Sequence, residues 1–168
     1  MKKVLMVLSI AFLGQTTLAQ AETDWTPYVR SMMYGCLFPD AANEGLPPLY
    51  EKSVVSKKVK VDKDYDNVDY EGDIITTFNL KNATAFYSPL LKVEQLQGYE
   101  WGHLKLYFKD TEFTSLRPSF KLPQPDDSEH SSIYVKKNNA SGYEVEELGY
   151  TTLNFDTKDK SITCSWSL

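Results

Sequence analysis

The feature that most limits how this chain can fold is a hydrophobic pattern of period two that begins at Ser53 and recurs to the carboxyl terminus. The segment SVVSKKVKVD alternates valines with polar and charged residues, and DIITTFNL is rich in β-branched residues. Successive side chains of a strand point to opposite faces, so this pattern indicates strands with one buried face. The segments NNASG and DTKDK separate such runs and carry turn-forming residues. We therefore expect about seven or eight strands in a mostly antiparallel sheet or sandwich.

A short helix is expected before the first strand. Pro27 suits the first turn of a helix, Tyr28 and Met32 recur at helical spacing, and Gly35 ends the run. These residues predict a helix over about Pro27 to Tyr34. Together with the strands, they place the chain in the α+β class.

Three further segments are predicted from their composition. FPDAANEGLPPLY is expected to be a loop, with at most one helical turn at Ala41–Glu44. Pro89 lies between ATAFYS and LLKVEQL, where it indicates a bend or a sheet edge because proline cannot donate to a ladder. EFTSLRPSFKL alternates weakly and is expected to be a strand that stops at the polar loop PQPDDSEHSS.

The expected core consists of apolar residues on the predicted inward faces of the strands. They are Val59, Val61, Ile75, Phe78, Leu80, Phe86, Leu91, Val93, Leu104, Leu106, Phe108, Val135, Leu153, Phe155 and Ile162.

The first 21 residues have the pattern of a secretory signal peptide. Lys2 and Lys3 precede the apolar run Val4–Leu13, and Ala19-Gln20-Ala21 forms a cleavage signature. The run is shorter than the roughly 20 residues of a membrane span, and no cysteine follows it near the cleavage site. We expect residues 22–168 to form a single mostly-β domain that is periplasmic or secreted and has no stable membrane anchor.

The charge balance argues against nucleic acid as a partner. The whole chain has a net charge of −5, and the signal contains two lysines and no acidic residue, so its removal leaves −7. An acidic domain is poorly suited to nucleic acid or to an anionic membrane surface, and it suits a basic partner. Acidity that serves solubility alone is the alternative.

The two cysteines, Cys36 and Cys164, are expected to form a disulfide. An even cysteine count in an exported protein indicates a disulfide, and their spacing fits neither a CxxC redox motif nor a zinc cluster. Such a bond would tie the first element to the last strand.

The segment WGHLKLYFKD divides between two strand faces. Leu104, Leu106 and Phe108 share an apolar face, whereas Trp101, His103 and Tyr107 share an amphipathic one. Two interpretations remain open for the second face. It is either the ordinary polar side of a half-buried antiparallel strand or a partner-binding surface built on Trp101, His103 and Tyr107.

The residues with potential chemistry form no complete motif. His130 follows two aspartates and a glutamate in PDDSEH, and His103 stands alone. Asp62, Asp64 and Asp66 have the alternate spacing of an EF-hand loop, but its glycine and its final glutamate are replaced. No Walker, HExxH, GxSxG or dinucleotide motif is present. We therefore predict no catalytic, cofactor-binding or metal-binding residue, although a pair of catalytic carboxylates stays open.

The stretch LKNATAFYSPLLKVEQLQGYEWGHLKLYFKD, Leu80 to Asp110, resembles a pattern in small exported proteins of Gram-negative bacteria. Some of these are similar to periplasmic immunity proteins paired with antibacterial toxins, as in type VI secretion. The resemblance rests on apolar and aromatic residues and implies an inhibitor that plugs or caps a toxin. It carries over no functional residue.

Three functions follow as hypotheses. The first is a non-enzymatic exported binding protein, such as an inhibitor or immunity partner of a toxin or envelope enzyme. The second is an exported carboxylate-dependent hydrolase that acts at the cell envelope. The third is a structural or adhesion-type surface component.

Overall fold

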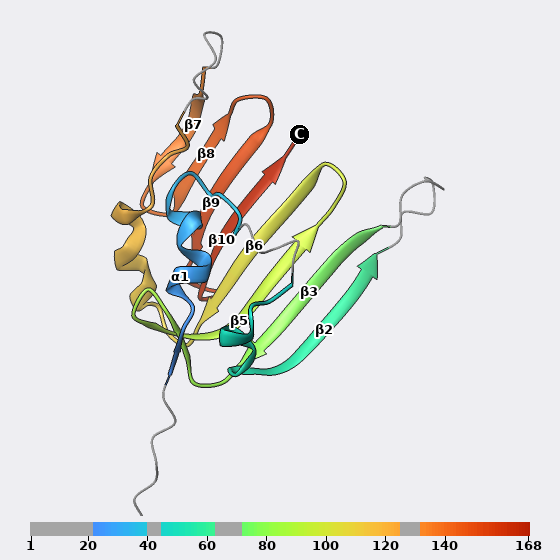
Figure 1. The fold of residues 1–168 in the computed structure, drawn as a ribbon. Helices are drawn as coiled ribbons and strands as arrows, with labels where there is room; N and C mark the ends of the chain where they lie inside the picture. The colour runs from blue at the N-terminus through green and yellow to red at the C-terminus, as the bar shows by residue number, and fades with distance from the viewer. Residues whose placement is uncertain (1–21, 40–44, 63–71, 125–131) are drawn as a thin grey trace, which may run out of the picture.

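The computed structural model describes residues 22–39, 45–62, 72–124 and 132–168, and within these ranges it contains one largely antiparallel sheet of ten strands. The strands are β1 (Thr23–Asp24), β2 (Val54–Asp62), β3 (Asp73–Leu80), β4 (Ala83–Ala85), β5 (Ser88–Gln97), β6 (Trp101–Phe108), β7 (Tyr134–Asn139), β8 (Gly142–Glu146), β9 (Tyr150–Asp156) and β10 (Ser161–Ser167). Eight of these described strands form an antiparallel path in the order β2-β3-β5-β6-β10-β9-β8-β7 (Figure 1). The short strands β1 and β4 pair in parallel and attach to the start of β5. The predicted α+β class is confirmed.

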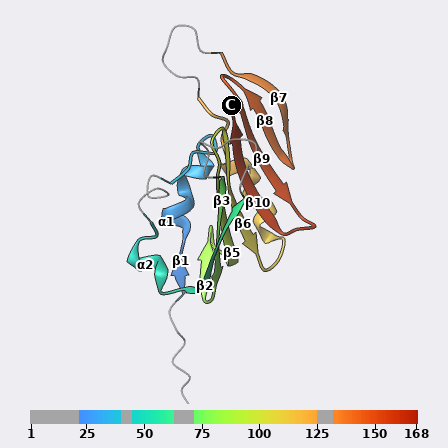
Figure 2. The same ribbon diagram turned by 90° about the vertical axis from the view of Figure 1, so that its right-hand side faces the viewer.

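Helical segments cover one face of this sheet. They are α1 (Thr26–Val29), the 3-10 helix η1 (Arg30–Met33), α2 (Pro48–Glu51) and the 3-10 helix η3 (Glu112–Ser119). In the edge-on view, α1 and α2 lie on the same side of the strands (Figure 2). η3 packs on the buried side of β6, where the rings of Phe113 and Phe108 stack with their centroids 4.9 Å apart. We call this covered side the inner face and the opposite side the outer face.

The predicted amino-terminal helix is present. One α turn and one 3-10 turn together span residues 26–33, against the predicted 27–34. Val29 and Met32 are fully buried and join the core cluster with the strand residues of the inner face. No helix among the described residues has the length and apolar character needed to cross a membrane.

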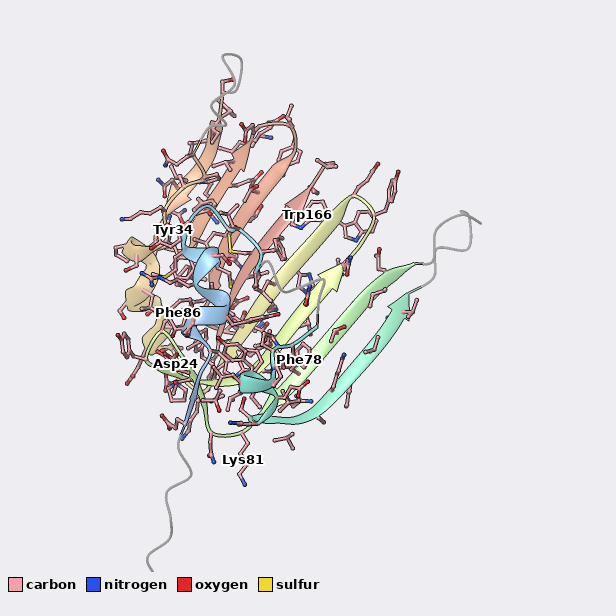
Figure 3. The ribbon with its side chains drawn as sticks, viewed as in Figure 1. Asp24, Tyr34, Phe78, Lys81, Phe86 and Trp166 are labelled. Carbon is pink, nitrogen blue, oxygen red and sulfur yellow. A yellow bond between two sulfur atoms is a disulfide. The ribbon has the colours of Figure 1, made fainter. Side chains whose placement is uncertain are left out.

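The predicted disulfide between Cys36 and Cys164 is confirmed, with a Cα–Cα distance of 5.2 Å. Cys36 follows η1, and Cys164 lies on the inner face of β10 and is fully buried. Tyr34, at the end of η1, and Trp166, near the carboxyl-terminal end of β10, are labelled on either side of this region (Figure 3). A disulfide is consistent with folding in an oxidising compartment outside the cytoplasm.

Most of the predicted core is confirmed. The buried members are Phe78, Leu80, Phe86, Val93, Leu104, Leu106, Phe108, Leu153, Phe155 and Ile162. The prediction is wrong for Val59 and Val61 on β2 and for Val135 on β7, which are 56%, 47% and 42% exposed. These three lie on the two edge strands, and the described helices cover the middle strands instead.

Two further core predictions fail for reasons of register. Ile75 is half-buried because it pairs with Leu96 on the outer face of the sheet, where the helices do not reach. Leu91 is 49% exposed because the β5–β6 register shifts between Leu90 and Lys92. This bulge gives Leu90 the inward position, where it is 1% exposed.

The expected strand at EFTSLRPSFKL is also wrong, because most of this segment forms η3. Phe113 and Phe120 are buried and Leu116 is half-buried, so the apolar residues are spaced by three and four rather than by two. The hydroxyls of Thr114 and Ser115 donate to backbone carbonyls three residues earlier, at 2.9 Å in each case. Such local bonds compete with a strand ladder and favour a tight helical turn.

Arg117 anchors η3 to the predicted NNASG hairpin, which is confirmed as β7–β8. Its guanidinium donates to Asn138 Oδ1 at 2.6 Å, to the carbonyl of Asn139 at 3.0 Å and to the carbonyl of Phe120 at 3.0 Å. Asn139 Oδ1 also accepts the backbone N–H of Ser141 within the turn at 2.9 Å. One side chain therefore fixes the inner layer to the end of the sheet.

Several predictions fall outside the described residues. These are the signal peptide and its cleavage site at 1–21, the helical turn at 41–44, and the residues Asp64, Asp66 and His130. Asp62 is described and ends β2.

Candidate functional site

The residues predicted for partner binding lie on the outer face of β6. The even-numbered residues from Gly102 to Phe108 are buried on the inner face. Trp101 is 49% exposed, and His103 and Tyr107 are half-buried. The predicted division of this strand between two faces is confirmed, and the partner-binding role remains a prediction.

A group of polar side chains surrounds Glu94 of β5, and we call Lys92, Glu94, His103 and Tyr107 the Glu94 cluster. His103 Nε2 lies 3.2 Å from Glu94 Oε1, and the Tyr107 hydroxyl donates to the same oxygen at 3.5 Å. Lys92 Nζ lies 3.6 Å from Glu94 Oε2 and 3.4 Å from the centroid of the Tyr107 ring. These contacts tie the side chains of two neighbouring strands together and limit their rotamers.

A second ion pair lies beside this cluster. Lys105 of β6 pairs with Asp159 of the β9–β10 turn, and its Nζ is 4.7 Å from the centroid of the Tyr107 ring. The hydrogen bond from Lys105 holds the pKa of the Asp159 carboxyl below its ordinary value. Burial lowers the pKa of Lys105, but its interactions with Asp159 and Tyr107 outweigh burial, and its pKa lies above its ordinary value. Both members of the pair are therefore charged near neutral pH.

Trp101 is held at one end of β6 by a polar contact and by a close approach of backbone. Its Nε1 donates to Asp73 Oδ2, at the start of β3, at 3.1 Å. Gly98 lies beneath the indole, since a Cβ added there would sit 2.6 Å from Trp101 Nε1. A glycine at position 98 therefore allows the indole to lie against the β5–β6 turn while half of its surface faces solvent.

The pairing of strands brings two further aromatic residues into line with Trp101. Trp101 pairs with Ser167, Ser167 with Tyr150, Tyr150 with Glu146, and Glu146 with Tyr134. Directly paired residues share one face, so these five residues form a line across the outer face that we call the outer-face row. Neighbouring strands lie about 5 Å apart, which separates the aromatic residues of the row by roughly 10 Å.

The middle of the row is fixed by Lys136 of β7. Lys136 Nζ lies 2.8 Å from Glu146 Oε2 and 4.1 Å from the centroid of the Tyr150 ring. The hydrogen bond to Glu146 raises the pKa of Lys136 above its ordinary value. Tyr150 and Tyr134 remain 40% and 67% exposed.

Sequence reasoning found Trp101 and missed Tyr134 and Tyr150. The hairpin turns NNASG and DTKDK were recognised, and counting outward from DTKDK would have aligned Tyr150 with Ser167. Counting outward from NNASG would have placed Tyr134 opposite Glu147, because the register shift between Val135 and Lys137 is what brings Tyr134 to Glu146. The sequence holds no comparable signal for the pairing of β6 with β10, because these strands are more than 50 positions apart.

The acidic groups Glu94 and Asp159 of the outer face are both in contact with basic side chains. A carboxylate that holds an imidazole is part of many hydrolytic centres, and Ser165 is the cross-strand neighbour of His103. However, Glu94 and Asp159 are each paired with a lysine, and the pKa of Asp159 is lowered, whereas a general acid requires a raised pKa. Among the described residues, no group of three or more His, Cys, Asp or Glu is placed to hold a metal ion.

Comparisons with known proteins identify no relative. No protein-family model matches the chain, and neither a curated protein nor a solved structure matches it.

Proposed function

We propose that this chain is an exported, non-enzymatic binding protein whose outer sheet face docks onto a partner protein. The observation that carries the proposal is the outer-face row, in which Trp101, Tyr150 and Tyr134 lie in line and are 40–67% exposed. Tryptophan and tyrosine are enriched among the residues that supply most of the binding energy at protein interfaces.

Rigid positioning of these side chains supports the same function. Trp101 is held by Asp73, Tyr150 by Lys136, and Tyr107 by Glu94 and two lysines. A side chain that is already ordered loses less conformational entropy when it binds, so more of its contact energy remains as affinity.

The specific form that we favour is an inhibitor or immunity partner of a toxin or envelope enzyme in the periplasm. The resemblance of Leu80–Asp110 to immunity-type proteins suggests it, and this stretch contains β5 and β6, which carry the Glu94 cluster. The signal-peptide pattern and the disulfide support export.

The hydrolase hypothesis ranks second because three acids of the outer face, Glu94, Asp159 and Glu146, are each paired with a lysine. A structural or adhesion-type component ranks third. It would use the outer-face row for self-association, which sedimentation of the purified protein would detect.

The test compares capture by the wild-type protein and by the double variant Trp101→Ala/Tyr150→Ala. Both are immobilised and exposed to envelope extracts of the producing cells and of neighbouring strains, and bound proteins are quantified by mass spectrometry. We expect one protein to be enriched on the wild type, and its purified form to bind the double variant at least about tenfold more weakly.

The matched control is Tyr34→Ala, because Tyr34 is 53% exposed and lies on the helical side of the sheet. It should bind the same protein with unchanged affinity. A partner that binds the double variant as tightly as the wild type would refute the outer-face site, and so would the absence of any enriched protein.

A further inference from the structure

We propose that the edge of β2 that faces away from β3 is a second binding site, which takes an extended acidic segment of another protein as an additional strand. β2 lies at one end of the strand order, and β3 is its partner among the described strands. An edge strand presents a row of backbone N–H and C=O groups that another chain can pair with. At nine residues, β2 is long for an edge that is left open.

The inner side of β2 carries an apolar strip that the described helices leave uncovered. Phe78 of β3 is 8% exposed beneath the helical layer, but Val59 and Val61, further along β2, are 56% and 47% exposed. Their partners on β3, Thr76 and Ile74, are half-buried. An added strand with apolar side chains on its inner side would extend this face and cover the two valines.

The start of the same edge adjoins a pocket of about 490 Å³. It is lined by Gly45, Leu46, Glu51, Val54, Lys57 and Phe78, so β2 and β3 form one wall and the α2 segment forms the other. An inward-facing side chain near the end of an added strand would be buried there.

The charge of β2 is opposite to that of the whole chain and defines the chemistry of the occupant. β2 contains Lys57, Lys58 and Lys60 against a single acid, Asp62, whereas the chain has a net charge of −5. Lys58 and Lys60 lie on the outer side of the strand, because they alternate with the inward valines. An acidic residue facing each of them across the new pair would be attracted, and like charges there would repel.

The same charges disfavour a second copy of this chain as the occupant. In an antiparallel pair of two β2 strands, the lysines of both copies would meet on one face. The other sheet edge, β7, carries Lys136 and Lys137 and would be repelled in the same way. The surface therefore fits a partner segment in which acidic and apolar residues alternate.

The probe for the test is a short capped peptide of alternating glutamate and valine. Two controls share its length: one with the glutamates and valines in separate blocks, and one with lysine in place of glutamate. Affinity is measured by fluorescence anisotropy on the purified protein, and backbone pairing by amide hydrogen exchange. We expect the alternating acidic peptide to bind at low salt and to slow exchange of β2 amides, and both control peptides to bind at least about tenfold more weakly.

The variant Lys58→Glu/Lys60→Glu should weaken binding of the acidic peptide roughly tenfold. The control Lys137→Glu/Lys158→Glu makes the same charge change away from β2 and should leave affinity unchanged. The proposal is refuted if the acidic peptide does not bind, if it binds without slowing β2 amides, or if the blocked peptide binds equally well. The variant Trp101→Ala/Tyr150→Ala should not alter peptide binding. Failure of the β2 proposal would therefore leave the outer-face proposal standing, and failure of the outer-face proposal would leave the β2 proposal standing.

Discussion

Cys36 and Cys164 are bonded to each other across 128 positions of the sequence, so one covalent bond holds the segment that follows η1 against the middle strand β10. Cross-linking residues so far apart restricts the unfolded chain strongly.

Removal of this bond should lower the free energy of unfolding. For a loop of this length the chain-entropy model predicts about 4–5 kcal/mol, as an upper value. The measurement is urea unfolding of the oxidised wild type against Cys36→Ser/Cys164→Ser. Two thiols that react with a labelling reagent in the native wild type would contradict the bond itself.

Truncating a side chain of β6 should lower the free energy of unfolding substantially only where that side chain lies on the inner face. Phe108 is 2% exposed and stacks on Phe113, so Phe108→Ala removes core contacts and should lower the free energy of unfolding by about 3–5 kcal/mol. His103 is half-buried and contacts Glu94 at the surface, so His103→Ala should cost within about 1 kcal/mol. Urea denaturation checks both values, and equal losses would show that the outer face is also covered.

Trp25 and Ser53 should be energetically coupled. Trp25 Nε1 donates to Ser53 Oγ at 2.9 Å, and both residues are buried. Ser53→Ala would leave the indole N–H without a partner and should cost about 1–3 kcal/mol. In a Trp25→Phe background this donor is absent, so the same change should cost clearly less. A double-mutant cycle measures the difference, and strictly additive losses would argue against the bond.

Tyr87→Gly should stabilise the protein. Tyr87 and Phe86 form the two-residue turn between β4 and β5 with φ values of 65° and 51°, a region that favours glycine. Tyr87 is fully exposed, so its loss removes no packing. Relief of the backbone strain should raise the free energy of unfolding by about 0.5–1 kcal/mol after the entropy cost of glycine.

The control for this prediction is Tyr34→Gly. Tyr34 is also exposed, but its φ is −116°, so glycine there should only destabilise. Equal effects of the two substitutions would mean that the turn is not strained.

The Lys105–Asp159 pair should make a small contribution to stability that depends on pH. The folded-state pKa of Asp159 lies below its ordinary value because of the bond from Lys105. The contribution is therefore present above the ordinary carboxyl pKa and is lost as pH falls through the lowered pKa. Asp159→Asn should be less stable than wild type by up to about 1 kcal/mol at neutral pH.

This difference should close as the pH falls through the lowered pKa of the Asp159 carboxyl, where the carboxyl protonates. Thermal unfolding of the wild type and the variant across the acidic range measures it. A difference that persists unchanged at low pH would assign the effect to packing rather than to charge.

The core prediction was correct for Leu104, Leu106 and Phe108. These residues alternate with polar ones along β6, and β6 lies in the middle of the sheet, where the inner face is covered. The prediction failed for Val59, Val61 and Val135, because alternation shows which side chains share a face but not whether another layer covers them. η3 was missed because the segment also alternates weakly with a period of two. The spacings of three and four between Phe113, Leu116 and Phe120, which indicate a helix, were therefore not recognised.

The sequence by itself determined the eight strands of the antiparallel path, the two hairpins, the disulfide pairing and the two faces of β6, because each depends on local periodicity, on turn residues or on there being only two cysteines. The tertiary structure decided that β6 pairs with β10 and that β2 and β7 are the edges. Those pairings join residues far apart in the chain, and they depend on how the whole sheet buries its inner face beneath the helices. They alone bring Trp101 into line with Tyr150 and Tyr134 and leave the lysines of β2 on an open edge.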